Sequence, residues 1–345
     1  MIVAIILFVL FGISMLFNLG NVAGNVFHGK SVRYTRTVGP RLDEVLYEDN
    51  DAANKIAIIE VGGIISGQAL DGGGFSLADV IKAQLRRAEE DDRVKAVLLK
   101  VDSPGGEVLA SDEIYRAIKD FQSRNHKPVI ASMGSLAASG GYYISAPCRW
   151  IVANEMTLTG SIGVIMSSWN YRGLMDKVGV VPQVFKSGKF KDMMSGSREP
   201  DSISPEEKAM VQALIDETFG RFKHIVQEGR SSAYDQNKDS KEKGQALSDD
   251  WQSYADGRVL SGSEALKLGF VDELGNFDDA VTRAKRIAGV SRANLVLYQQ
   301  RFDLSDMFRI FGKTDSSAKI KVDLGMDAPK IQAGKLYFLS PTFVH

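Results

Sequence analysis

The chain has few of the residues from which catalytic triads and metal sites are most often built. Its 345 residues include one cysteine and four histidines. Cys148 cannot form a disulfide within the chain, and without a neighbouring base motif it is interpreted as a small buried hydrophobic residue. The histidines stand far apart, and no His, Cys or carboxylate cluster has metal-ligand spacing. We therefore expect neither a histidine triad, nor a metal ion, nor any other cofactor.

An excess of charge of one sign is also lacking. The 42 Lys and Arg and the 43 Asp and Glu leave a formal net charge of −1. No basic patch is interleaved with aromatic residues, so the sequence does not favour nucleic acid as a partner. With 44% hydrophobic residues, the chain can bury the core of one large domain or of two small ones.

The N-terminal segment lacks charged side chains altogether, since Lys30 is the first. Met1 to Phe17 is apolar apart from Ser14, and residues 1–26 are long enough to cross a bilayer as a helix. A cleaved signal peptide is the alternative, but the basic segment that should begin one is missing. We predict a transmembrane anchor over 1–26. The basic residues after it would place the body in the cytoplasm by the positive-inside rule.

Strand-like and helix-like segments alternate after a polar stretch over 31–54. Val94 to Val101 is a near-continuous apolar run, as in a strand that is buried on both faces, and 127–133 reads as another strand. Apolar residues at helical spacing predict a helix over 77–90, and 107–121 is a further helix. This alternation predicts an α/β fold.

Both of those strands lead into glycine-rich segments, which read DSPGG over 102–106 and AASGG over 137–141, the latter after a turn at 134–136. Ser139 would lie at the start of a helix, where free backbone N–H groups can stabilise developing negative charge. The amides of Gly106 and Gly140 are therefore candidate donors to an oxyanion. The alternative is that Ser139 only caps the helix.

A third segment, 187–195, carries Lys189 and Lys191 in the motif SGKFKDMMS, after a strand-like run over 181–185. By itself, a lysine there is an ordinary solvated charge. Lysine acts as a general base only when its pKa falls from about 10.4 toward neutrality, and desolvation favours such a fall. Three apolar neighbours of Lys191 could form the walls of a desolvated site: Phe190, Met193 and Met194.

These three segments, together with TGSIGV over 159–164, resemble the signal peptide peptidase A family of serine-lysine proteases. That family belongs to the fold group of Clp protease and crotonase. The resemblance runs from about residue 56 to residue 289 and includes a fifth motif over 257–272. Several motifs in the same order make the resemblance specific.

The resemblance implies particular roles for five residues. Ser139 is the nucleophile, and Lys191 is the general base. The amides of Gly106 and Gly140 form the oxyanion hole. Ser161 orients the amine of the lysine.

The resemblance also implies a Clp protease/crotonase-like fold of repeated ββα layers that follows the N-terminal transmembrane helix. The sequence pattern predicts one long amphipathic helix over 206–228. The polar residues 229–254 that follow are expected to form a mobile surface insertion. Residues 334–339 are either a last strand or a docking tail. We divide the chain into four parts: an anchor (1–26), a linker (27–54), a protease domain (55–290) and a C-terminal extension (291–345).

The function implied by the resemblance is that of a membrane-anchored serine endopeptidase that cleaves remnant signal peptides and other small hydrophobic or unfolded peptides. It would be a single-pass protein of the bacterial inner membrane, with its catalytic domain on the outer side, against the positive-inside rule. A homo-oligomeric ring would complete each site across a subunit boundary. Two alternatives stay open: a non-enzymatic membrane-anchored assembly scaffold, and a crotonase-type acyl-CoA hydratase or isomerase.

Overall fold

The computed structural model describes residues 39–69, 74–238, 243–300 and 335–339. The anchor predicted over 1–26 lies outside these residues. Within the described ranges, no helix combines the length and the apolar character needed to span a bilayer.

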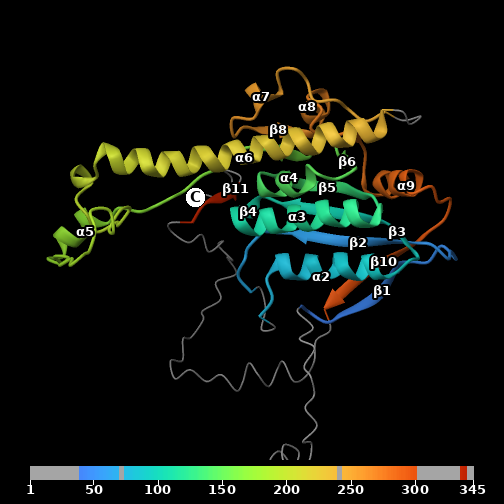
Figure 1. The fold of residues 1–345 in the computed structure, drawn as a ribbon, viewed down its shortest axis with the longest axis horizontal. Coiled ribbons are helices and arrows are strands. Elements are labelled where there is room, and N and C mark those ends of the chain that lie inside the picture. The colour runs from blue at the N-terminus through green and yellow to red at the C-terminus, as the bar shows by residue number, and fades with distance from the viewer. Residues whose placement is uncertain (1–38, 70–73, 239–242, 301–334, 340–345) are drawn as a thin grey trace, which may run out of the picture. The chain divides into compact units, whose positions relative to one another are not determined.

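The core of the molecule is a mostly parallel sheet, which has nine strands in the described part of the chain (Figure 1). Seven of them follow the order β1-β10-β2-β3-β5-β6-β9, and β7 pairs with β5 and β8. A separate two-stranded sheet joins β4 and β11. The strands are β1 (Leu42–Glu48), β2 (Lys55–Gly62), β3 (Val94–Ser103), β4 (Gly105–Glu107), β5 (Val129–Ala138), β6 (Trp150–Ala153), β7 (Leu158–Gly160), β8 (Val259–Ser261), β9 (Glu273–Leu274), β10 (Asn294–Gln300) and β11 (Tyr337–Leu339).

Helices cover both faces of this sheet, because successive side chains of a strand point to opposite sides. Ile59 and Leu99 belong to the core under α2, α3 and α4. Ile58 and Leu98 belong to the core under α9 (Figure 1). The α/β prediction is thereby confirmed. The helices are α2 (Leu77–Glu90), α3 (Val108–Asn125), α4 (Gly140–Ser145), α5 (Arg172–Lys177), α6 (Pro205–Asn237), α7 (Trp251–Tyr254), α8 (Gly262–Lys267) and α9 (Phe277–Ile287).

The turn predicted over 134–136 is wrong, because β5 runs without interruption to Ala138. Its second half finds a partner in β7, with Leu136 opposite Leu158. The Leu136 amide also donates to a carboxylate oxygen of Asp102 at 3.0 Å. A Cβ on Gly134 would lie 3.1 Å from the Asp102 side chain, so this glycine permits close approach within a strand.

The strand predicted over 181–185 is also wrong. This segment has no regular secondary structure and pairs with no other strand in the described residues. Val181 and Phe185 are 76% and 88% exposed. An apolar run becomes a strand only where a sheet edge accepts its backbone.

Both boundaries of the protease domain need correction. The predicted linker contains β1, and the predicted C-terminal extension contains β10, which pairs with β2. β1 and β10 pair antiparallel with each other at the edge of the sheet. Nearly all of β1 is exposed, so it lacks the apolar alternation by which a strand is recognised in a sequence.

The surface insertion expected over 229–254 is wrong for residues 229–237, which extend α6 and are partly buried. A Cβ on Gly229 would lie 2.4 Å from the Ala146 carbonyl oxygen, so only glycine allows α6 to pass so closely. The next residue of α6, Arg230, forms an ion pair with Asp272 at 2.5 Å, and both side chains are fully buried. The second half of α6 is therefore part of the core.

We expect Arg230→Met to lower the free energy of unfolding by about 3–5 kcal/mol, because it leaves the Asp272 carboxylate buried without its cation. Arg221→Met is the matched control: Arg221 is on the same helix, partly exposed and 3.6 Å from Asp112. That change should cost no more than about 1 kcal/mol. Urea denaturation measures both, and equal losses would contradict the role given to the buried pair.

Candidate active site

Ser139 is held in a strained conformation between β5 and α4. Its φ of 54° and ψ of −115° are rarely adopted by residues other than glycine, and such strain concentrates at functional sites. The side chain is 1% exposed, and its hydroxyl has no hydrogen-bond partner among the described residues. The alternative of a helix cap is contradicted, because the hydroxyl makes no capping bond.

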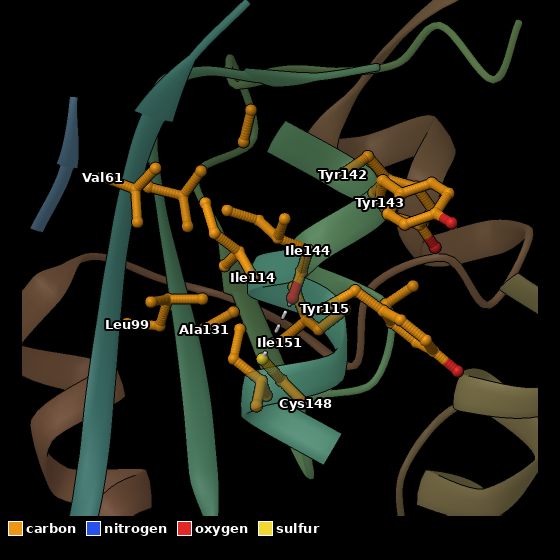
Figure 2. Close-up of a cluster of buried hydrophobic side chains, with 14 of the residues drawn as sticks. Val61, Leu99, Ile114, Tyr115, Ala131, Tyr142, Tyr143, Ile144, Cys148 and Ile151 are labelled. Carbon is orange, nitrogen blue, oxygen red and sulfur yellow. Dashed lines mark hydrogen bonds between the residues drawn. The ribbon is translucent and has the colours of Figure 1, made fainter. Parts of the chain in front are cut away.

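The backbone around Ser139 is fixed on both sides. Its amide donates to the Gly160 carbonyl at 2.8 Å, and its own carbonyl accepts from the Tyr143 amide at 2.8 Å. α4 is buried throughout, and Figure 2 shows its Tyr142 and Tyr143 packed into the core. The Tyr142 hydroxyl donates to the Phe270 carbonyl at 2.9 Å. The serine is thus carried by rigid elements, as a precise site requires.

The two predicted oxyanion donors lie together beside this serine. A Cβ built on Gly140 would lie 3.0 Å from the Gly106 amide nitrogen and 2.8 Å from the Ser111 hydroxyl. A Cβ on Gly106 would lie 1.9 Å from the Ile65 carbonyl oxygen. Both positions therefore exclude any side chain. Gly140 is the first residue of α4, where the amide has no acceptor within its own helix.

Ser161 is brought to the same place by β7. Gly160 pairs with Ala138, so Ser161 follows the residue whose carbonyl holds the Ser139 amide. Ser161 is buried, and its φ is 49°. Its amide donates to the Arg258 carbonyl at 2.7 Å, which shows how the motif over 257–272 supports the site.

Lys191 is not brought to Ser139 within the chain. Its side chain is exposed, and it forms no ion pair or side-chain hydrogen bond with the described residues. The segment 163–206 that carries it contains no buried residue, and Figure 1 draws its helix α5 well away from α4. By contrast, Lys189 pairs with Glu206 at 2.6 Å.

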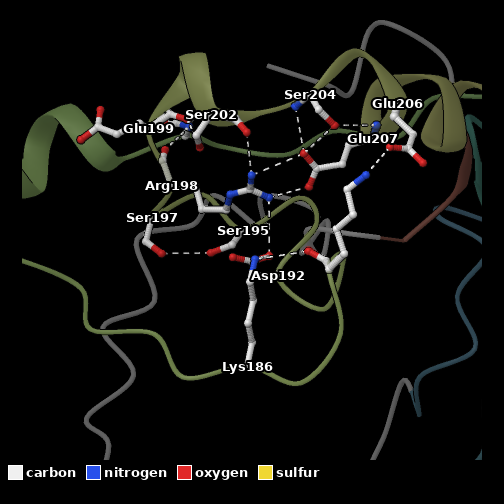
Figure 3. Close-up of polar contacts among 12 residues, drawn as sticks. Lys186, Asp192, Ser195, Ser197, Arg198, Glu199, Ser202, Ser204, Glu206 and Glu207 are labelled. Carbon is white, nitrogen blue, oxygen red and sulfur yellow. Dashed lines mark hydrogen bonds and ion pairs between the residues drawn. The ribbon is translucent and has the colours of Figure 1, made fainter.

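An ion-pair network that the sequence did not reveal organises the loop around Lys191 (Figure 3). Asp192 accepts a hydrogen bond from Lys186 at 2.6 Å, and Arg198 donates to Glu207 at 2.5 Å. Glu207 also completes the capping box of α6 with Ser204. This SxxE pattern is the one feature of the network that the sequence could have revealed.

This network should hold at neutral pH. The hydrogen bond from Lys186 lowers the pKa of Asp192, and that from Arg198 lowers the pKa of Glu207 to about 2. A lowered carboxylate pKa stabilises the folded loop fully above the ordinary glutamate value of about 4.3. The contribution of Glu207 is lost only as the pH falls from there toward about 2.

The described residues were also compared with two other kinds of site, a metal centre and a reactive thiol. In the described ranges, no group of three or more His, Cys, Asp or Glu could hold a metal ion. Cys148 is fully buried, and burial raises the pKa of its thiol, so this residue is unreactive at neutral pH.

Known proteins resemble this chain over most of the same region. The sequence profile of peptidase family S49 matches residues 122–291, and that of Clp protease matches 63–155. A candidate protease of Synechocystis sp., slr0021, is 41% identical over 236 residues, which cover 68% of this chain and 75% of the relative. The chain belongs to peptidase family S49.

Other S49 relatives carry more specific names. A candidate signal peptide peptidase SppA of Enterococcus faecium is 34% identical over 262 residues, which cover 75% of this chain and 71% of the relative. Protease 4 of Salmonella typhi is 35% identical over 260 residues, which cover 74% of this chain but only 38% of the relative. The resemblance to the signal peptide peptidase A family is confirmed, and membership supports a serine protease.

Proposed function

We propose that the chain is a serine endopeptidase in which Ser139 is the nucleophile. The observation that carries this proposal is a strained, buried serine whose hydroxyl has no hydrogen-bond partner among the described residues, next to the backbone amides of Gly106 and Gly140. A hydroxyl in that position is free to attack a carbonyl carbon, and the two amides can receive the negative charge that develops on the carbonyl oxygen.

The reaction would proceed in two steps. A base removes the Ser139 proton as the oxygen attacks the peptide carbonyl, and the same group then protonates the leaving amine, which leaves an ester on the serine. Water, activated by that base, hydrolyses the ester and releases the acid. We assign the base to Lys191 and the orientation of its amine to Ser161.

The exposure of Lys191 favours a dyad made by two copies of the chain. A lysine amine must lose its proton to act as a base, and a wall that excludes water promotes this. The described residues of one chain leave Lys191 exposed. Its segment 163–206 also exposes large apolar side chains, including Trp169 at 79% and Phe185 at 88%, more than an isolated chain normally leaves in water. A neighbouring subunit of a homo-oligomeric ring would cover this segment and bring Lys191 to another Ser139.

Mixing two inactive variants tests this arrangement. Ser139→Ala subunits keep the lysine, and Lys191→Ala subunits keep the serine, so mixed oligomers should regain part of the peptidase activity at interfaces that pair the two. The control replaces the Ser139→Ala partner with a Ser139→Ala/Lys191→Ala double variant, which should restore nothing. If mixed oligomers, verified by native mass spectrometry, stay inactive at every ratio, the dyad lies within one chain.

We further propose that the substrates are small hydrophobic or unfolded peptides, remnant signal peptides among them. A ring that encloses its sites would admit such chains and exclude folded proteins. The apolar residues 1–26 would anchor the chain in the bacterial inner membrane by a single span, with the catalytic domain on the outer side. The names of the SppA relatives support this substrate class.

A further inference from the structure

β5 contains a bulge shortly before the candidate nucleophile. The strand pairs with β3 in regular register up to Met133 and again at Ala137. Between these two positions, β5 has three residues, 134–136, and β3 has only one, Asp102. A bulge of this kind bends a strand and re-aims the side chains that follow it, and bulges are frequent beside active sites. The contacts that fix this bulge therefore also help to fix Ser139.

The bulge is the point at which β5 changes its partner. Before it, Met133 pairs with Ala153 of β6, and after it, Leu136 pairs with Leu158 of β7. The pairing with β7 continues to the end of β5, directly before Ser139. The register that is set at Leu136 is therefore the register that reaches the serine.

Side chains of neighbouring segments bind the backbone groups of the bulge. The Leu136 amide donates to the Asp102 carboxylate at 3.0 Å. The Thr157 hydroxyl donates to the Gly134 carbonyl at 2.8 Å. Thr157 is buried, whereas Asp102 is exposed. Of the two, Asp102 can therefore be replaced without opening a cavity in the core.

Asp102 is itself held in place by the strand on its other side. It pairs with Gly62 of β2, and its carbonyl accepts from the Gly63 amide at 3.0 Å. A Cβ on Gly134 would lie 3.1 Å from both Cβ and Cγ of Asp102, so the glycine leaves room for the carboxylate. A hydrogen bond from a backbone amide to a carboxylate is stronger than one between neutral groups. The carboxylate thus takes the place of a ladder partner for the Leu136 amide.

We infer that Asp102 is a positioning residue of the proposed active site, whose carboxylate holds the bulge of β5 in the register that brings Ser139 to the oxyanion donors. This rests on the proposed role of Ser139 as the nucleophile. The two ends of the motif DSPGG then serve one site, because Asp102 fixes the strand that carries the serine and Gly106 supplies an amide. A misplacement of about 1 Å can cost about 10²-fold in rate, so the loss of this hydrogen bond should be visible in kcat.

Asp102→Ala should lower kcat for a fluorogenic peptide at least about tenfold and leave KM within about twofold, because it misplaces the nucleophile and removes no group proposed to bind the peptide. Asp102→Asn should keep at least about a third of the wild-type kcat, since its amide oxygen can accept the same hydrogen bond. Asp102 is exposed, so both variants should fold, which thermal unfolding checks. Wild-type kcat in Asp102→Ala, or equal losses in the two variants, would overturn the inference.

Glu60→Ala is the matched control. Glu60 is an exposed carboxylate of the neighbouring strand β2, and it forms an ion pair with the side chain of Lys100 at 2.9 Å. An exposed pair of this kind contributes little, so kcat should stay within about twofold of the wild-type value. A loss equal to that of Asp102→Ala would show that any change of charge at this end of the sheet lowers activity, and it would overturn the inference.

A hydrogen-exchange measurement separates this inference from the proposed function. In the full chain, the Leu136 amide should exchange at least about tenfold faster in Asp102→Ala than in the wild type, and Asp102→Asn should restore most of the protection. Mass spectrometry at single-residue resolution measures this without any substrate. An unchanged rate in Asp102→Ala would refute the inference whether or not the chain hydrolyses peptides. Faster exchange, together with a wild type that hydrolyses no peptide, would refute the peptidase function and leave Asp102 as the residue that fixes the bulge.

Discussion

Ser139→Ala should lower kcat for peptide hydrolysis by at least about 10⁴-fold, as the loss of a nucleophile does in serine proteases. The fold should survive, because the hydroxyl has no hydrogen-bond partner among the described residues and its removal leaves no described group unpaired. Hydrolysis of a fluorogenic peptide measures the first effect. Thermal unfolding measures the second, and the melting temperature should not fall.

Ser145→Ala is the matched control for this prediction. Ser145 is buried like Ser139, but it lies in α4, and its hydroxyl donates to the Gly141 carbonyl at 2.8 Å within the helix. Its replacement should leave kcat within about twofold of the wild-type value, because Ser145 takes no part in the proposed reaction. If the two substitutions lower kcat equally, the loss reflects damage to α4, and Ser139 is not the nucleophile.

Lys191→Ala should lower kcat by about 10²–10⁴-fold, the usual contribution of a general base. Lys191→Arg should not restore activity, because a guanidinium does not release its proton near neutral pH. Hydrolysis assays on oligomers of verified size measure both changes.

Lys189→Ala is the control on the same loop. Lys189 is exposed, pairs with Glu206 at 2.6 Å and lies 4.6 Å from the centre of the Phe190 ring. An exposed pair of this kind contributes little, so activity should stay within about twofold. Equal losses for Lys189→Ala and Lys191→Ala would contradict the choice of base.

The part of the site that the sequence predicted is the part built from local motifs. DSPGG and AASGG begin in the last two residues of β3 and β5, which are parallel neighbours, so their glycines meet at the same end of the sheet. Ser161 follows β7, the parallel partner of the second half of β5. The convergence of short motifs at the ends of adjacent parallel strands can therefore be predicted without information on distant parts of the chain.

The features that the sequence did not predict depend on distant pairing. β1 is exposed, its apolar residues do not alternate with polar ones, and it pairs with β10, which lies far along the chain. The apolar residues over 181–185 read as a strand but find no edge. Residues 334–339 could be read as a strand or as a tail, and the structure shows that Tyr337–Leu339 form a strand, which pairs with β4. In the proposed dyad, the position of Lys191 depends on a second subunit, which one chain does not contain.

Covalent labelling is the most direct test of Ser139 as the nucleophile. The folded full-length protein would be treated with a fluorophosphonate, digested and mapped by tandem mass spectrometry, with Ser139→Ala treated in parallel. We predict one adduct, on Ser139, and no labelling of the variant. An adduct on another residue, or hydrolysis of peptides by a protein that the probe does not modify, would contradict the proposed nucleophile.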